Sequence, residues 1–256
     1  MNLTLQQIIN TNKNGNIYGT CLLPDGKMVF SSSTNIFKSG TITVLNANGS
    51  LSFEVKLPSS FDVTYITEDN TLAVSSGSSG QCISIIDMQN QKVKKTIHVN
   101  GFIYGIIFNE SKLIYSGRLQ GIQMINPNDK TRSNIVEGEM PKDCYISTFG
   151  DKFVHTNPNE NTVKCYDLQG QLHWTFQDKS VLQTPAGISV DNSGNVYVVG
   201  RKSNNLIMIS PDGKQQRQLL SLNEGLSKRC AIHFSKERNM LIVATKIEKV
   251  FLYSVN

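Results

Sequence analysis

Two kinds of turn signal alternate along the whole chain at nearly constant spacing. Members of the first series lie between apolar runs, 40 to 44 residues apart: Asp25-Gly26, Asp69-Asn70, Asn109-Glu110, Gly150-Asp151, Ser193-Gly194 and Glu237-Arg238. Members of the second series lie one hairpin further on and are 39 to 43 residues apart: Asn48-Gly49, Gln89-Asn90, Asn128-Asp129, Gln169-Gly170 and Asp212-Gly213. Repeats of about 40 to 50 residues with turns at fixed offsets are typical of β-propellers. The sequence therefore predicts an all-β fold, a six-bladed β-propeller of four-stranded blades.

The two ends of the chain indicate how this ring closes. One further interval after Gly213 reaches Asn256, where the sixth blade should turn into its outermost strand. Residues 3–8 mix apolar and polar side chains and can provide that strand, which would remove an open sheet edge. We therefore predict that residues 1–256 form one propeller, closed by the N-terminal strand completing the last blade. The blade at residues 136–176 fits the repeat least well, and its register stays open.

Small residues mark the innermost strands, and the cysteines lie in or beside strand-like runs. Gly19 and Gly105 occupy the same offset from their turns, which predicts close packing of strands at the axis of the ring.

The odd number and the spacing of the cysteines fit neither a disulfide framework nor a metal site. We expect them to be buried, reduced thiols: Cys21, Cys82, Cys144, Cys165 and Cys230.

Composition places the chain among compact soluble proteins. Hydrophobic residues make up 39% of it, and no apolar run reaches the roughly 18 residues that a membrane-spanning helix needs. The first residues lack the basic and apolar regions of a signal peptide. These features predict a cytoplasmic protein, and a closed ring predicts a monomer.

One repeat carries a specific family signature. Residues 185–199 read Pro-Ala-Gly-Ile-Ser-Val-Asp-Asn-Ser-Gly-Asn-Val-Tyr-Val-Val, and residues 204–213 continue with an Asn-rich loop, an apolar strand and a Gly turn. This repeat resembles the NHL repeat, whereas the other five keep only its skeleton. Gly200 stands where many members have an Asp. The whole is similar to the divergent C-terminal propeller of tripartite-motif (TRIM-NHL) ubiquitin-ligase-type proteins, which implies a propeller that recognises a substrate protein.

A propeller of this kind has two unlike faces, and its loops predict where a partner binds. Tight turns gather on one face, while the longer connections between blades and between second and third strands gather on the other. We assign eight basic side chains to that loop face against four acidic ones, Asp62, Asp143, Glu160 and Glu248. Phe61 also falls in or beside its loops. The predicted binding residues are Lys38, Arg118, Lys142, Arg201, Lys202, Lys228, Arg229, Lys246, Phe37 and Phe102.

Three functions remain open at this point. The favoured one is a non-catalytic module that grips a protein or peptide through the loop face. The second is binding of single-stranded RNA, because basic groups interleaved with aromatic rings can hold phosphates and stack bases, and some propellers of the similar family bind RNA. Surface Lys and Arg side chains can also serve solubility alone.

The third alternative is a metal-dependent, lactonase-like hydrolase. It would need carboxylate or amide ligands that converge inside the ring. The innermost strands offer mainly Ile, Val, Leu, Cys and Tyr, and His233 is the one histidine predicted near the axis. We therefore predict no catalytic residue, no metal and no cofactor.

Overall fold

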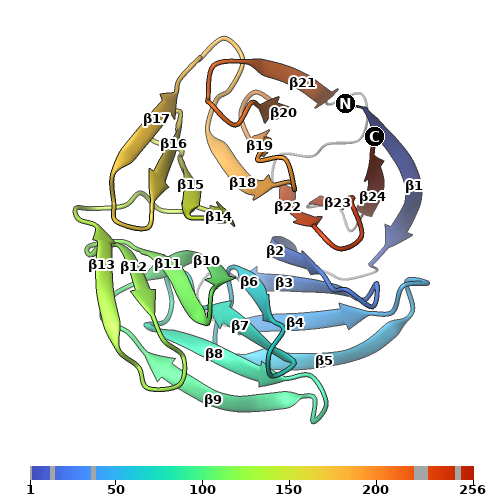
Figure 1. The fold of residues 1–256 in the computed structure, drawn as a ribbon. Coiled ribbons are helices and arrows are strands. Elements are labelled where there is room, and N and C mark those ends of the chain that lie inside the picture. The colour runs from blue at the N-terminus through green and yellow to red at the C-terminus, as the bar shows by residue number, and fades with distance from the viewer. Residues whose placement is uncertain (1, 12–14, 36–38, 222–229, 246–248) are drawn as a thin grey trace.

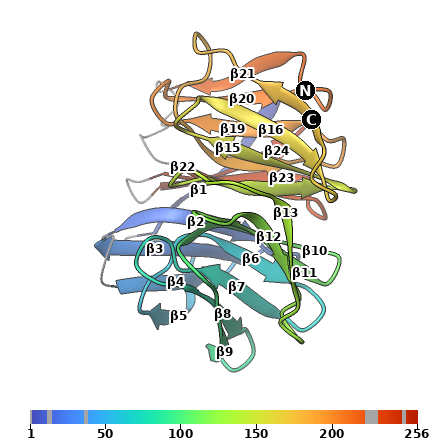
Figure 2. The same cartoon turned by 90° about the vertical axis from the view of Figure 1, so that its left-hand side faces the viewer.

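Six four-stranded antiparallel sheets surround a common axis and form a six-bladed β-propeller (Figure 1). The computed structural model describes residues 2–11, 15–35, 39–221, 230–245 and 249–256. In each blade the strands follow one another outward from the axis, and Figure 2 shows them running between the two faces of the ring. The predicted fold class is confirmed. None of the described residues belongs to a helix long and apolar enough to cross a membrane.

The first three blades in chain order consist of β2 (Asn16–Leu22), β3 (Met28–Asn35), β4 (Ser39–Leu45) and β5 (Leu51–Leu57); β6 (Val63–Ile66), β7 (Thr71–Ser75), β8 (Cys82–Asp87) and β9 (Lys92–His98); and β10 (Ile103–Asn109), β11 (Lys112–Gly117), β12 (Gly121–Ile125) and β13 (Arg132–Val136). The next two consist of β14 (Ile146–Phe149), β15 (Lys152–Asn157), β16 (Thr162–Asp167) and β17 (Leu172–Phe176); and β18 (Pro185–Val190), β19 (Val196–Gly200), β20 (Asn205–Ile209) and β21 (Gln216–Ser221). The last blade consists of β22 (Cys230–Ser235), β23 (Met240–Thr245), β24 (Lys249–Val255) and β1 (Leu3–Asn10).

The N-terminal strand closes the ring as predicted. β1 pairs antiparallel with β24 from Leu3 opposite Val255 to Asn10 opposite Lys249, with one irregularity between Leu5 and Gln7. The two termini therefore lie side by side (Figure 1). This pairing covers the backbone groups of β24, which would otherwise form an open sheet edge.

The predicted turns are confirmed by the backbone. Each hairpin on the turn face contains a residue with positive φ, a conformation that Gly, Asn and Asp adopt more readily than other residues. After first strands these residues are Gly26, Asn70, Glu110, Gly150, Gly194 and Asn239, and after third strands they are Gly49, Gln91, Lys130, Gly170 and Gly213.

The hydrophobic core is divided among the six junctions between neighbouring blades. One cluster, for example, packs Val29 and Ile42 of the first blade against Leu72 and Val74 of the second, and the other five clusters fill the remaining junctions. Middle strands such as β7 and β19 are buried throughout, because their sheets are covered on both faces.

The axis is tightly packed where glycines were predicted. A Cβ atom on Gly19 would lie 2.7 Å from Cα of Asp62, and one on Gly105 would lie 2.7 Å from the backbone nitrogen of Ile146.

The structure also defines the strands of the blade at residues 136–176, whose register the sequence left open. A long connection, residues 137–145, separates β13 from β14, so that blade begins later than even spacing implies.

Candidate functional site

The two faces of the ring differ in the length of their connections. The turn face carries the hairpins after first and third strands. The loop face carries the remaining connections, of which the described ones are residues 58–62, 76–81, 99–102, 118–120, 137–145, 158–161, 177–184 and 201–204. Because long connections can differ from blade to blade without disturbing the sheets, the loop face is the first place to look for a binding site.

Half of the predicted binding residues fall in the described part of this face. They are Phe102, Arg118, Lys142, Arg201 and Lys202, and all come from the third, fourth and fifth blades. The predicted residues Phe37, Lys38, Lys228, Arg229 and Lys246 lie outside the described residues.

Two arginines on the loop face are held by ion pairs. Arg201 Nη1 lies 3.1 Å from Asp143 Oδ2, and Arg118 Nη2 lies 3.3 Å from Glu139 Oε1. The N–H of Arg118 donates to the carbonyl of Phe102 at 2.9 Å. These five residues, Phe102, Arg118, Glu139, Asp143 and Arg201, form what we call the arginine cluster. Connections from three blades thus contribute to one ordered patch.

The backbone around the arginine cluster is also fixed. Asp143 and Thr184 have φ values of 59° and 52°, which are unusual for residues other than glycine and above all for a β-branched side chain. The N–H of Thr184 donates to Oδ1 of Asn161 at 2.7 Å, and its carbonyl accepts the N–H of Arg201 at 3.0 Å. These bonds hold the loop that presents Arg201.

An aromatic plug closes the axis beneath the loop face. Phe61 contacts three rings, with centroid distances of 5.6 Å to Tyr18, 5.3 Å to Tyr104 and 5.0 Å to Tyr145. Only 5% of Phe61 is exposed, so its side chain packs in the plug and is not a surface ring that could stack on a base. The position of Phe61 in a connection between blades had suggested a place on the loop face, but its side chain points toward the axis of the ring.

Acidic Asp62 lies beside the plug and is also buried, contrary to its assignment to the surface. Its carboxylate accepts the N–H groups of Val63 at 2.9 Å and Ile106 at 3.1 Å. Burial raises the pKa of Asp62 to about 7, against the opposing effect of these two hydrogen bonds. Burial also raises the pKa of Tyr104, and Arg118 next to it acts in the opposite sense.

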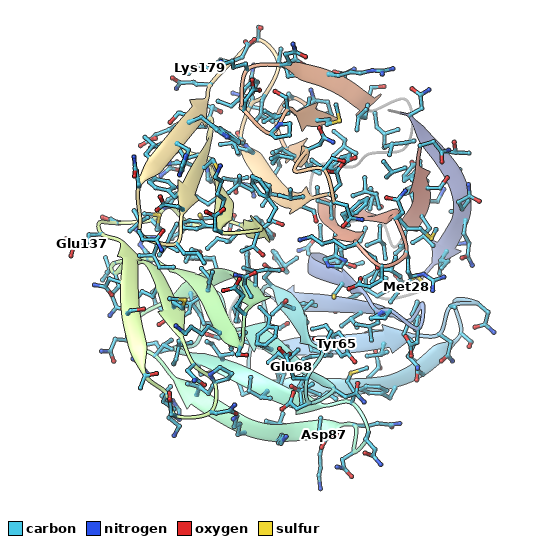
Figure 3. The ribbon with its side chains drawn as sticks, in the orientation of Figure 1. Met28, Tyr65, Glu68, Asp87, Glu137 and Lys179 are labelled. Atoms are coloured by element: carbon cyan, nitrogen blue, oxygen red, sulfur yellow. The ribbon has the colours of Figure 1, made fainter. Side chains whose placement is uncertain are left out.

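The described part of the loop face does not carry the excess of positive charge that the sequence suggested for the whole face. Its described connections carry five basic side chains, Arg118, Lys142, Lys179, Arg201 and Lys202, against six acidic ones, Asp62, Glu137, Glu139, Asp143, Glu160 and Asp178. The sequence assignment left out Glu137, Glu139, Asp178 and Lys179, because the extents of the connections at 137–145 and 177–184 could not be read from spacing. Glu137 and Lys179 lie at the periphery of the ring (Figure 3).

Leu119, an apolar side chain next to the arginine cluster, was missed by sequence reasoning, whereas Phe102 was predicted. Leu119 is 72% exposed and Phe102 is 37% exposed. The carbonyl of Arg118, just before Leu119, accepts the N–H of Met140 at 2.8 Å. Leu119 also lines a groove of about 520 Å³ together with Gln120 and Glu137. A leucine in a tight connection between two strands gave no sequence signal, because only the tertiary structure shows that nothing covers it.

A second candidate site lies on the axis at the turn face. It is a cavity of about 220 Å³ to which each innermost strand contributes. One equivalent side chain from each blade lines it, and we call these six the axial ring: Cys21, Thr64, Ile107, Ser147, Ser189 and His233. The position of His233 near the axis is confirmed, but three hydroxyl groups stand where mainly apolar side chains were predicted.

His233 and Cys21 do not form a reactive pair. The N–H of Leu22 donates to Nδ1 of His233 at 3.1 Å, so the proton of the neutral ring is on Nε2, which faces Cys21 Sγ at 3.9 Å. Burial lowers the pKa of His233 to about 4 and raises the pKa of Cys21 to about 12. A nitrogen that carries a proton cannot accept one from the thiol. Among the described residues no group of three or more His, Cys, Asp or Glu side chains could hold a metal ion.

Comparisons with known proteins identify the fold. No family model matches the sequence, and no curated protein matches it. A structural genomics protein of unknown function from Bacteroides thetaiotaomicron matches all of this chain and 76% of its own length, with a TM-score of 0.79 and 12% identity. Virginiamycin B lyase from Staphylococcus aureus matches 99% of this chain and 100% of its own, with a TM-score of 0.70 and 15% identity.

Two further structures show that similar folds serve different purposes. A catalytically inactive His-to-Ala variant of the same lyase, determined with quinupristin, has a TM-score of 0.70 and 16% identity over 99% of this chain and 100% of its own. A chain of the nidogen/laminin complex has a TM-score of 0.69 and 11% identity over 82% of each chain. With identities this low, the similarity establishes a six-bladed propeller and leaves the function to be argued from the site.

Proposed function

We propose that this propeller is a non-catalytic recognition module that binds a protein or peptide partner through its loop face. The observation that carries the proposal is the arginine cluster, which includes the exposed Phe102, with the exposed side chain of Leu119 beside it. Aromatic residues and Arg are enriched at the energetic centres of protein interfaces, and a polar rim around an apolar centre is the usual arrangement. Ion pairs to Glu139 and Asp143 hold both arginines in place before a partner arrives.

The distribution of charge favours a protein over RNA as the partner. A surface for single-stranded RNA needs an excess of positive charge along the path of the backbone. The described loops carry nearly equal numbers of basic and acidic side chains. Arg118 and Arg201 already have carboxylate partners. Phe61, which could have supplied a stacking surface, is buried in the aromatic plug. Mixed charge around exposed apolar side chains is the chemistry of a protein interface.

The geometry of the axial cavity speaks against catalysis at its two most reactive side chains. His233 presents a proton at Nε2, and the thiol of Cys21 stays protonated at neutral pH. The virginiamycin B lyase that the fold resembles is an enzyme, so the same architecture can support catalysis in another chain. Here the loop-face cluster supplies binding groups but no acid and base pair.

The repeat at residues 185–213 supports a more specific form of the proposal. Its likeness to the NHL repeat makes this chain a candidate for the substrate-recognition propeller of a cytoplasmic, tripartite-motif ubiquitin-ligase-type protein. In that form any ligase activity resides in other domains. We also propose that the isolated ring is a monomer, which is supported by the pairing of β1 with the edge of β24.

A matched set of variants tests the proposal. Arg201→Glu/Lys202→Glu and Leu119→Asp alter the loop face, while Lys214→Glu alters an exposed lysine of the turn face. Each protein is used as bait in quantitative affinity capture from cell extract, and the captured partner is then purified and its Kd measured directly. We expect the partner to bind the wild type and Lys214→Glu equally, and to bind both loop-face variants at least about tenfold more weakly.

A nucleic-acid experiment with the same proteins discriminates the RNA alternative. Fluorescence anisotropy with random-sequence single-stranded RNA is recorded at low and at physiological salt. Binding that falls steeply with salt and is lost in Arg201→Glu/Lys202→Glu would replace the protein-binding proposal by RNA recognition. Partner binding that is equal for all variants would also reject the loop face as the site.

A further inference from the structure

Three of the six members of the axial ring, Thr64, Ser189 and His233, perform the same structural task. The innermost strand of each blade has a neighbouring strand on one side only, so N–H groups that face the axis need another acceptor. Thr64 Oγ1 accepts the N–H of Phe108 at 3.2 Å, and Ser189 Oγ accepts the N–H of Phe234 at 2.8 Å. His233 Nδ1 does the same for Leu22. In each case a side chain of one blade caps the backbone of the next.

This pattern is broken at the fourth blade. The N–H of Thr148 occupies the equivalent place there, and the ring residue before it is Ile107, which has no polar atom to offer. The following ring residue, Ser147, is only 7% exposed, and among the described residues its hydroxyl group has no hydrogen-bond partner. It lines the cavity. A hydroxyl group that faces a cavity and has no hydrogen bond within the protein can donate to a bound ligand.

Lys236 brings a positive charge to the same side of the cavity. Its Nζ donates to the carbonyl of Thr148 at 3.2 Å, which leaves further N–H groups of the ammonium available. Within the part of the chain that the structure describes, no carboxylate lies within 4 Å of this nitrogen. Burial lowers the pKa of Lys236, whereas Glu237, which also lines the cavity, and Asp191 act in the opposite sense at longer range.

We propose that the axial cavity at the turn face binds a small organic anion whose carboxylate or phosphate group is held by the ammonium of Lys236 and the hydroxyl of Ser147. The hydroxyl hydrogens of Thr64 and Ser189 are further donors, since the oxygens of these residues already act as acceptors. These donors line one cavity, and a ligand rich in acceptors can bond to several of them. An oxyanion is the group that fits this set.

The size and the remaining lining fit an organic molecule better than an inorganic ion. The volume of about 220 Å³ corresponds to roughly seven water molecules at about 30 Å³ each. Tyr65, Phe108 and Val190 supply apolar surface around the polar end. Tyr65 lies on β6 in the inner part of the ring (Figure 3). Small-molecule sites typically combine an apolar enclosure with a few convergent polar groups.

Isothermal titration calorimetry with defined probes tests this site. The probes are benzoate, succinate and inorganic phosphate, with benzamide as the uncharged counterpart of benzoate. The proteins are the wild type, Lys236→Met and Ser147→Ala, with Lys214→Met as a control for loss of a turn-face charge outside the cavity. Circular dichroism and size-exclusion chromatography verify that each variant is folded.

The expected result is binding of at least one anionic probe and no binding of benzamide. Lys236→Met should weaken that binding about tenfold or more, since a hydrogen bond to a charged group is lost, and Ser147→Ala should weaken it several-fold. Lys214→Met should leave it unchanged. Absence of binding for every anion, or binding that Lys236→Met and Ser147→Ala leave unaltered, would overturn the proposal. Since the cavity and the arginine cluster lie on opposite faces, this outcome is independent of the loop-face experiment.

Discussion

A buried histidine remains neutral unless both ring nitrogens have partners, and His155 is such a residue. It is 2% exposed in β15, with Nδ1 at 3.4 Å from the carbonyl of Thr156. Because a carbonyl only accepts hydrogen bonds, Nδ1 carries the proton. Nε2 has no partner among the described residues. Burial lowers the pKa of His155 to about 4, so the unfolded chain takes up a proton more readily than the folded protein as the pH falls below about 6.5.

Replacement of this residue should reduce the acid sensitivity of the fold. We expect protonation of His155 to lower the free energy of unfolding of the wild type by about 2 kcal/mol between about pH 6.5 and about pH 5. The variant His155→Gln should lack this decrease. Asp62 acts in the opposite sense, since its raised pKa favours proton uptake by the folded state, but its contribution cancels between wild type and variant. Urea unfolding at both pH values provides the measurement, with exposed His173→Gln as control. Parallel pH dependence of wild type and His155→Gln would contradict the prediction.

Among the elements, the innermost strands have the least room. A Cβ atom on Gly105 in β10 would lie 2.7 Å from backbone atoms of Tyr145 and Ile146 at the next blade. Backbone atoms cannot rotate away as a side chain can, so the strands themselves would have to separate. Gly117, at the end of β11, provides a contrast, because its nearest heavy atom would be 3.4 Å away.

The variant Gly105→Ala should therefore destabilise the protein by about 1–3 kcal/mol, whereas Gly117→Ala should change the free energy of unfolding by less than about 0.5 kcal/mol. Chemical denaturation of both variants under the same conditions gives the comparison. If both substitutions have equal effects, crowding at the axis is not the reason for the glycine in β10.

For the whole molecule, closure of the ring depends on a strand far away in sequence. β1 covers the edge of β24, and Ile9 on β1 is 6% exposed in the cluster that joins the last blade to the first. Removal of residues 1–10 would uncover both the sheet edge and part of this cluster. Leu5 and Ile8 on the same strand are 46% and 52% exposed, so their side chains contribute little to closure.

We expect the truncated protein to melt more than about 10 °C lower than the wild type, because it loses several kcal/mol of burial and pairing. It should also associate through the open edge of β24. The control Leu5→Lys/Ile8→Lys keeps the backbone pairing and should remain monomeric, with nearly the same Tm. Differential scanning calorimetry and light scattering measure both properties. A truncated protein with unchanged Tm would show that β1 does not close the ring in solution.

The sequence by itself determined the architecture of this protein, because turns such as Asp25-Gly26 and Asp212-Gly213 act locally and recur at fixed spacing. The same local reasoning placed Gly19 and Gly105 at the axis and paired the first strand with the last blade. It reached Arg118 and Arg201 as loop residues, but could not foresee their partners Glu139 and Asp143, which depend on how long connections fold back.

Only the tertiary structure decided which side chains are covered. Phe61 and Leu119 both lie in connections and look alike as apolar loop residues, yet one fills the axis and the other is exposed. The axial cavity arose in the same way, since the six members of its ring are about 40 residues apart and meet only when the blades surround the axis. Spacing along a chain fixes local structure, whereas burial, charge pairing and cavities are set by contacts between segments distant in sequence.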